Sequence, residues 1–203
     1  MRLRHLIGLG NRLSTQTKQA RQMIYFLTPY HPDKSLGISY DWLIDTSPNI
    51  DDWVCMTDAD TIFTTYDFGD QIMATIEENP DYHLFTCMTN RVNNRIQVCG
   101  DWSSNDMAYH RMVGQQRWEE YGTSVIDITQ DQLLSGMMIC TTHEHWMKSG
   151  MQGKRHKQGQ MLGIDNEIHL AYRHAGLKVG LMQGIYLYHW YRGGDKSNKA
   201  HLL

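Results

Sequence analysis

The chain lacks several features that would assign it at once to a membrane or to a nucleic acid. No run of 18 apolar residues occurs in its 203 residues, so we expect no transmembrane helix. Its formal net charge of −3 provides no basic surface for DNA or RNA, so no nucleic-acid partner is expected. No Cys-x-x-Cys pair occurs, and Cys55 and Cys140 fall in apolar, strand-like runs. These cysteines indicate a reduced compartment, and we expect a cytoplasmic protein.

The composition, with 41% hydrophobic and 20% charged residues, is that of a soluble globular protein. The length favours a single domain, which we place at residues 23–203. Residues 1–22 contain five basic residues and no acid, with apolar side chains at helical spacing. This segment could dock on the domain or be a frayed terminus, resemble a transit peptide, or make a peripheral contact with an anionic membrane, which would be the inner face of a cell membrane. The sequence leaves the oligomeric state open.

The most informative stretch is 53–63, written WVCMTDADTIF. Its apolar run predicts a buried strand, and two acids, Asp58 and Asp60, follow that strand directly. In an open α/β sheet, ligands bind at the carboxyl ends of strands, and adjacent acids there favour a divalent cation. In the alternative interpretation, Asp58 and Asp60 form a turn and cap the following helix.

Hydrophobic periodicity predicts an α/β fold that opens with strand, helix and strand. The predicted strands cover residues 23–30, the run before Asp58, 83–88 and 133–140, with two further apolar segments at 178–182 and 185–190. The predicted helices cover residues 34–46, 67–79, 105–121, 142–149 and 164–175. Glycine interrupts the strand 133–140, and glycine within a strand often marks close approach by a ligand or another backbone. The polar loop 150–163 is a candidate lid.

Four features in this order resemble the nucleotide-sugar glycosyltransferases of the GT-A fold, most closely those of family 2. They are Asp58-Ala59-Asp60, Ser135-Gly136-Met137, the segment 163–167 that opens a helix, and His189. The resemblance covers roughly residues 23–192. It implies a single Rossmann-like domain with a mixed, mostly parallel sheet flanked by helices. In this family a further strand and helix usually lie between the segment that holds the nucleoside base and the Asp-x-Asp motif. Only 27 residues separate Tyr30 from Asp58 here, so we expect the nucleotide-binding half of the domain to be shortened.

The resemblance also implies roles for the acids and the histidine. Asp60 and His189 would bind Mn²⁺ or Mg²⁺, and Asp58 would be a further ligand or a ribose contact; the imidazole favours manganese. Asp165 would deprotonate the acceptor hydroxyl, with inversion at the anomeric carbon. The family's glutamate before this acid is replaced by Ile164, and a less polar neighbour raises a carboxyl pKa toward that of a useful base. Asp165 could instead stabilise a helix dipole, and His189 could be a core residue.

The expected substrates are a nucleotide sugar, with UDP as the expected nucleotide, and a glycan, lipid-linked or protein acceptor. Thr28, Pro29 and Tyr30 would hold the nucleoside, with Tyr30 stacking on the base. Arg192 and Lys196 would close on the diphosphate or remain solvated. The residues expected near the acceptor are Trp102, Gly136 and Glu167; core packing is an alternative for Trp102, as is a structural role for Glu167.

Two other functions fit the same residues. The stretch 53–63 also resembles the first motif of haloacid-dehalogenase-type phosphatases, in which Asp58 would be the nucleophile and Asp60 the acid and base. That motif usually lies on the first strand, whereas a complete strand and helix precede it here. The third interpretation is a catalytically degenerate GT-A protein that only binds a nucleotide or a glycan.

Overall fold

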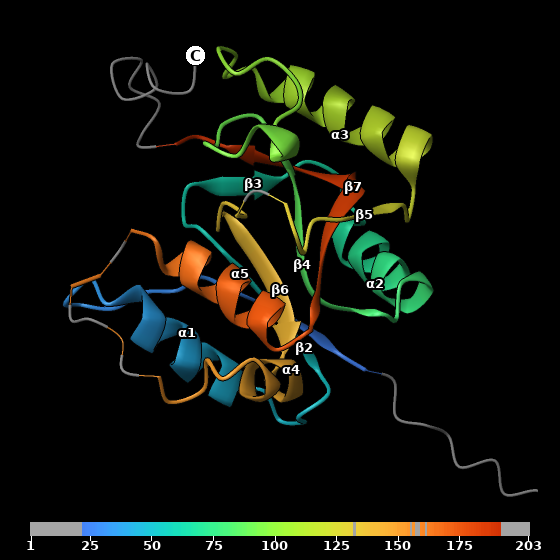
Figure 1. Cartoon of the computed structure of the whole chain (residues 1–203). Helices are drawn as coiled ribbons and strands as arrows, with labels where there is room; N and C mark the ends of the chain where they lie inside the picture. Colours follow the sequence, from blue (N-terminus) through green and yellow to red (C-terminus); the bar gives the residue numbers. More distant parts are fainter. Residues whose placement is uncertain (1–21, 132, 155, 157–158, 161, 192–203) are drawn as a thin grey trace, which may run out of the picture.

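The computed structural model describes residues 22–131, 133–154, 156, 159–160 and 162–191. The basic segment before Gln22 and the predicted phosphate contacts Arg192 and Lys196 lie outside this part of the chain. Within it, the protein is an α/β structure in which helices flank an open, mixed sheet of seven strands (Figure 1). No helix in the described ranges combines the length and the apolar character that crossing a bilayer requires.

Six strands follow one another across the sheet in the order β1, β2, β6, β4, β7, β3, and β5 pairs with β7. Their bounds are β1 Ile24–Leu27, β2 Trp53–Thr57, β3 Thr61–Phe63, β4 Tyr82–Thr89, β5 Val125–Asp127, β6 Met138–Thr142 and β7 Lys178–His189. The prediction of a mostly parallel sheet is wrong. Only β1–β2 and β4–β7 are parallel among the described pairings, and the other four are antiparallel. Two of the antiparallel strands, β3 and β5, have three residues each, which is too short for periodicity to reveal.

The five predicted helices are present, with bounds that differ from the prediction by one or two residues. They are α1 Leu36–Asp45, α2 Phe68–Glu78, α3 Met107–Tyr121, α4 His143–Lys148 and α5 Ile164–His174; a short 3₁₀ helix, η1, spans Arg95–Gln97. Their ends follow local chemistry. The Thr142 side chain accepts a hydrogen bond from the His145 backbone N–H at the start of α4, and Gly122 ends α3 with a positive φ of 48°.

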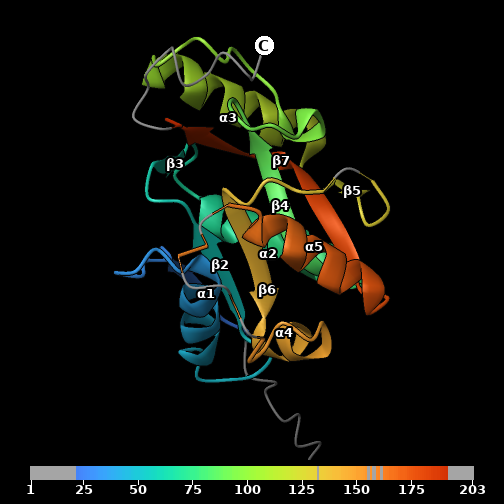
Figure 2. The same cartoon turned by 60° about the vertical axis from the view of Figure 1, so that its left-hand side comes forward.

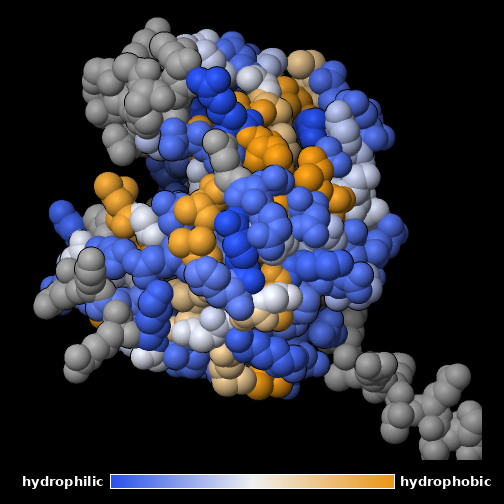
Figure 3. Space-filling view, viewed as in Figure 1, coloured by the Kyte–Doolittle hydropathy of each residue, from blue (hydrophilic) through white to orange (hydrophobic). Residues whose placement is uncertain are grey.

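The sheet has a hydrophobic core on each face. Along β2, Val54 and Met56 point to one core and Trp53 and Cys55 to the other, as the two-residue repeat of a strand requires. Helices α1, α4 and α5 supply the first core and α2 the second, while α3 lies along β7 (Figures 1 and 2). In the view of Figure 3 most of the surface is hydrophilic, and hydrophobic side chains gather in its upper and central part.

The two apolar segments predicted at 178–182 and 185–190 are one strand, β7. The strand passes through Gly184, where an added Cβ would lie 2.0 Å from the Gly122 carbonyl oxygen, so the glycine permits the two backbones to approach closely. A register irregularity accompanies this point, since Met182 pairs with Cys87 and Tyr186 with Met88. The glycine therefore marks close packing within a strand and not a break between two.

The predicted opening of strand, helix and strand is correct. Strand β1 pairs in parallel with β2, with α1 as the crossover between them. Pro29 follows β1, and among the described residues no strand lies beyond β1, which places it at the edge of the sheet. The carboxyl end of β2 thus opens between the edge strand and β6, and the acidic residues follow at this point.

Candidate metal and catalytic site

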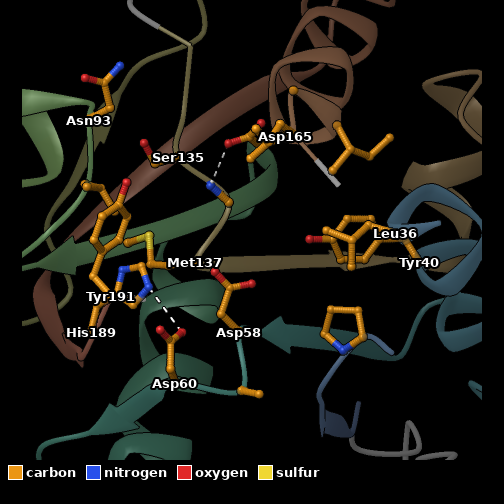
Figure 4. A pocket seen from close by; sticks show the side chains of 17 residues that line it. Leu36, Tyr40, Asp58, Asp60, Asn93, Ser135, Met137, Asp165, His189 and Tyr191 are labelled. Carbon is orange, nitrogen blue, oxygen red and sulfur yellow. Dashed lines mark hydrogen bonds and ion pairs between the residues drawn. The ribbon is translucent and has the colours of Figure 1, made fainter. Parts of the chain in front are cut away.

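A cleft of about 530 Å³ opens at the carboxyl end of β2. The connection after β2, the end of β7, the segment before β6 and the start of α5 all contribute side chains to it (Figure 4). Its described lining includes three carboxyl groups and one imidazole but no lysine or arginine. Among the lining residues are Pro29, Leu36, Tyr40, Asp58, Asp60, Ser135, Gly136, Ile164, Asp165 and His189.

Asp58, Asp60 and His189 come together at one end of this cleft. One potential ligand atom from each lies within 4.8 Å of those of the other two, and His189 Nε2 is 3.3 Å from an Asp60 carboxylate oxygen. The pairing of β3 with β7 sets this arrangement, because it puts Thr61 opposite His189. The Trp190 backbone N–H also donates to the Asp60 carbonyl oxygen at 2.8 Å. The alternative in which these acids cap a helix is wrong, since β3 follows them and Asp67 is the N-cap residue of α2.

The hydrogen bonding of His189 fixes which ring nitrogen is available to a ligand. Its Nδ1 lies 2.8 Å from the Arg91 carbonyl oxygen. A carbonyl oxygen only accepts, so Nδ1 carries a proton and donates it to this bond. In the neutral imidazole, the lone pair is then on Nε2, the nitrogen that faces Asp60. Two acceptors face each other at 3.3 Å unless a cation or a second proton lies between them. Metal-binding histidines commonly have their other N–H held in this way.

Burial changes the acidity of Asp58. It raises the pKa of this carboxyl from 3.8 to about 6; the charge of His189 opposes the shift, and the charges of Asp60 and Asp165 add to it. Carboxyl groups crowded in a partly buried site disfavour one another's ionisation. A bound cation reverses that balance and keeps the carboxylates ionised, so the three groups at this end of the cleft are suited to a divalent metal ion.

Two residues outside the cleft, neither found from the sequence, hold His189 in place. The Asn90 side chain accepts a hydrogen bond from the His189 backbone N–H at 2.8 Å. Arg91 is fully buried, and its guanidinium donates to the carbonyl oxygens of His189, Trp190, Trp102 and Ser104. The sequence TNRVNNR predicts only a polar loop, because arginine is rarely buried.

Asp165 lies in the first turn of α5, and its carboxyl group contacts the glycine segment. One carboxylate oxygen accepts from the Gly136 backbone N–H at 3.1 Å, and the other accepts from the Asn166 N–H at 2.9 Å. Burial raises the pKa of Asp165, while these hydrogen bonds oppose the shift. The direction agrees with the expectation from the apolar neighbour Ile164, which is 3% exposed. Asp165 is therefore a carboxyl group in the cleft with an increased affinity for protons.

The strand predicted at 133–140 begins only at Met138, so the first half of that prediction is wrong. In place of a neighbouring strand, the buried Gln97 side chain binds Ser135, accepting from its N–H at 2.7 Å and donating to its carbonyl oxygen at 3.3 Å. Gly136 follows, and an added Cβ there would lie 2.8 Å from the Asp165 Cβ. Glycine at this position permits the Asp165 side chain to approach the segment, whereas the sequence indicated approach by a ligand or another backbone.

The remaining predicted site residues lie around the cleft and not all within it. Pro29 lines it, whereas Thr28 is exposed and Tyr30 is 76% exposed, so neither is among the lining residues. Trp102 also does not line the cleft, and its carbonyl oxygen binds Arg91. Glu167 accepts from Gln160 and pairs with Lys154 at 3.1 Å, which holds part of the loop 150–163 against α5.

Comparison with known proteins does not assign this chain to a family. No protein-family model matches it, and no curated protein matches its sequence. The functional argument therefore depends on the site itself, which combines a place for a divalent cation with a separate carboxyl group of raised pKa.

Proposed function

We propose that the protein is a metal-dependent glycosyltransferase of the GT-A type that moves a sugar from a nucleoside diphosphate, with UDP as the expected nucleotide, to an acceptor hydroxyl. The observation that carries the proposal is the pairing of the Asp58, Asp60 and His189 cluster with Asp165 in one cleft. The absence of lysine and arginine from the described lining adds to it. Phosphate groups would enter a cleft with three carboxyl groups only together with a cation.

In this proposal the chain's own residues have two tasks. Asp58, Asp60 and His189 hold Mn²⁺ or Mg²⁺, which would neutralise the charge that develops on the departing diphosphate. Asp165 accepts the proton of the acceptor hydroxyl as the oxygen attacks the anomeric carbon; its raised pKa brings its proton affinity closer to that task. Direct attack would invert the configuration at that carbon. The acceptor is a glycan, a lipid-linked glycan or a protein, and the proposed location is the cytoplasm, with contact at the inner face of a membrane through residues 1–22.

The test measures metal-dependent nucleotide binding. We expect UDP or GDP, or one of their sugar esters, to raise the melting temperature of the protein only when Mn²⁺ is present, because a ligand of the native state stabilises it by mass action. Asp60→Ala should abolish this shift while leaving the fold intact. The matched control is Asp81→Ala, which removes an exposed aspartate whose partner is Lys178. Retention of the Mn²⁺-dependent shift in Asp60→Ala would refute the proposed metal site.

Two further outcomes of this test correspond to the other interpretations. Turnover of a phosphate ester with no nucleotide binding would replace the proposal with a phosphatase that uses Asp58 as its nucleophile and Asp60 as its acid and base. Metal-dependent binding of a nucleotide sugar without hydrolysis or transfer, across a panel of acceptors, would favour the degenerate binding protein. The replacement of the family's glutamate by Ile164 is the sequence feature that supports this last outcome.

A further inference from the structure

Tyr40 directs its hydroxyl group into the cleft (Figure 4), and the described part of the protein provides no hydrogen-bond partner for it. The residue is on α1 and only 2% exposed. Its ring packs edge-on against Trp146, with centroids 6.4 Å apart. Its hydroxyl points into the cleft toward Asp58 (Figure 4), and Tyr40 is one of the lining residues.

Other buried tyrosines of the same protein have partners for their hydroxyl groups. The Tyr172 hydroxyl lies 2.6 Å from the Thr141 hydroxyl oxygen, and the Tyr186 hydroxyl lies 2.7 Å from His110 Nδ1. The Tyr40 hydroxyl instead remains accessible from the cleft and makes no hydrogen bond that stabilises the described part of the fold. Tyr40 therefore has an oxygen that the fold does not need, at a position where a ligand would meet it.

The surroundings of the hydroxyl indicate what kind of ligand group it would bind. Burial, together with the charges of Asp58 and Asp165, raises the pKa of Tyr40, so its hydroxyl keeps its proton. The side chains of Pro29, Leu36 and Ile164 make the neighbouring wall of the cleft apolar. The two charged groups that act on the hydroxyl are carboxylates, which accept hydrogen bonds. A ligand hydroxyl suits this combination, because it can donate to a carboxylate and accept from a phenol at the same time.

We propose that Tyr40 is a specificity residue whose hydroxyl binds a sugar-ring hydroxyl of the donor. The inference rests on the proposed function, since it takes the cleft to be the site of a nucleotide sugar. Two rings of such a donor present this chemistry, the ribose of the nucleoside and the sugar to be transferred. Tyr40 and Asp58 would then bind a ring hydroxyl together, and the apolar wall would contact the ring carbons.

The experiment compares the unaltered chain with Tyr40→Phe, which keeps the ring against Trp146 and removes only the oxygen. Binding is measured by titration calorimetry with Mn²⁺ present. The ligands are the nucleoside diphosphate that stabilises the unaltered chain, its 2′-deoxy and 3′-deoxy forms, and the corresponding nucleotide sugar. We expect Tyr40→Phe to weaken binding of the nucleotide sugar by about two- to twelvefold, the effect of one net hydrogen bond. Mn²⁺ binding alone should not change.

The ligand panel separates the two rings. If the ribose is the partner, the nucleoside diphosphate shows the same loss, and one deoxy form binds the unaltered chain and Tyr40→Phe equally. If the transferred sugar is the partner, the loss occurs only with the nucleotide sugar. Equal binding of every ligand by the two proteins would overturn the inference and leave the proposed function standing. No nucleotide binding by the unaltered chain would overturn both.

Thermal unfolding without ligands provides an independent check on the Tyr40 hydroxyl. Tyr40→Phe should melt at the same temperature as the unaltered chain or higher, because it removes a group without a partner. The matched control is Tyr172→Phe, which removes a hydroxyl that is hydrogen-bonded to Thr141 and should melt at a lower temperature. A lower melting temperature for Tyr40→Phe, equal to that of the control, would show that the hydroxyl has a partner within the fold and would refute the inference.

Discussion

Replacement of Gly136 by alanine tests the contact on which the position of Asp165 depends. An added Cβ would lie 2.8 Å from the Asp165 Cβ and 3.6 Å from its Cγ. Cβ atoms do not approach other carbons this closely, so the backbone of the segment or the start of α5 would have to move. Gly136 does not have a positive φ, so the expected effect is steric and does not come from a forbidden backbone conformation.

The magnitude follows from this overlap. Adding one methyl group to a tightly packed site typically costs about 1–3 kcal/mol. Displacement of the segment would also lengthen the hydrogen bond from the Gly136 N–H to Asp165, now 3.1 Å, which contributes about 1 kcal/mol. Because the two losses have one cause, we expect a total destabilisation of about 2–3 kcal/mol. Mn²⁺ affinity should also fall, because the carbonyl oxygen of the next residue, Met137, accepts a hydrogen bond from the Asp58 N–H at 3.1 Å. The proposed transferase activity should fall more sharply, since Asp165 itself is displaced.

Urea denaturation measures the loss as a lower midpoint with an unchanged m-value. Gly69→Ala is the matched control. Gly69 lies near the start of α2, where an added Cβ meets only Phe26 ring atoms at 3.8 and 4.0 Å. Alanine favours a helix over glycine, so this variant should be as stable as the unaltered chain or up to about 1 kcal/mol more stable. Equal midpoints for the two variants would refute the steric argument.

Two further predictions concern polar groups near the site. Because burial raises the pKa of Asp58 from 3.8 to about 6, the folded metal-free protein binds its proton more tightly than the unfolded chain. This group should lower the free energy of unfolding by about 2 kcal/mol between pH 4 and pH 6, so the difference in stability between these two pH values should change by that amount in Asp58→Asn, measured by urea titration. Gln97→Leu should cost about 2–4 kcal/mol, because it leaves the Ser135 N–H and carbonyl oxygen unpaired. The control Gln115→Leu loses only an exposed bond to Glu119 and should stay within about 0.5 kcal/mol; equal midpoints would contradict the prediction.

Regular apolar patterns predicted most of the elements that form the cleft. The run before Asp58 becomes β2, and the amphipathic stretch after Gly163 becomes α5. Asp58 directly follows the end of β2, and Asp165 lies in the first turn of α5. Both positions face the cleft. The local pattern was therefore sufficient to identify Asp58 and Asp60 as candidate site residues, whereas the resemblance to the glycosyltransferases was needed to add Asp165.

Two features could not be predicted from local patterns. One is a strand of only three residues, and the other is a side chain that binds the backbone where a neighbouring strand would pair with it. β3 has only three residues, and its pairing with β7 is the contact that brings Asp60 to His189. Ser135 binds the Gln97 side chain where the sequence pattern predicted a strand. In both cases the decisive partner is distant in the sequence and leaves no periodic signal, so local patterns could indicate the residues of the site but not how they are held.

The electrostatics of the cleft also depend on Arg91, which lies in the predicted polar loop but is buried, as the sequence pattern did not indicate. The charged guanidinium of Arg91 lies behind His189 and binds carbonyl oxygens there, so it does not neutralise the acids in the cleft by direct contact. Three carboxyl groups then face one cavity with no lysine or arginine in its described lining. A cation that joins crowded acids of this kind lowers their affinity for protons. Arg91 thus fixes the imidazole from behind and keeps His189 Nε2 facing Asp60. Under the proposed function, this arrangement would hold the metal ion to which the diphosphate binds.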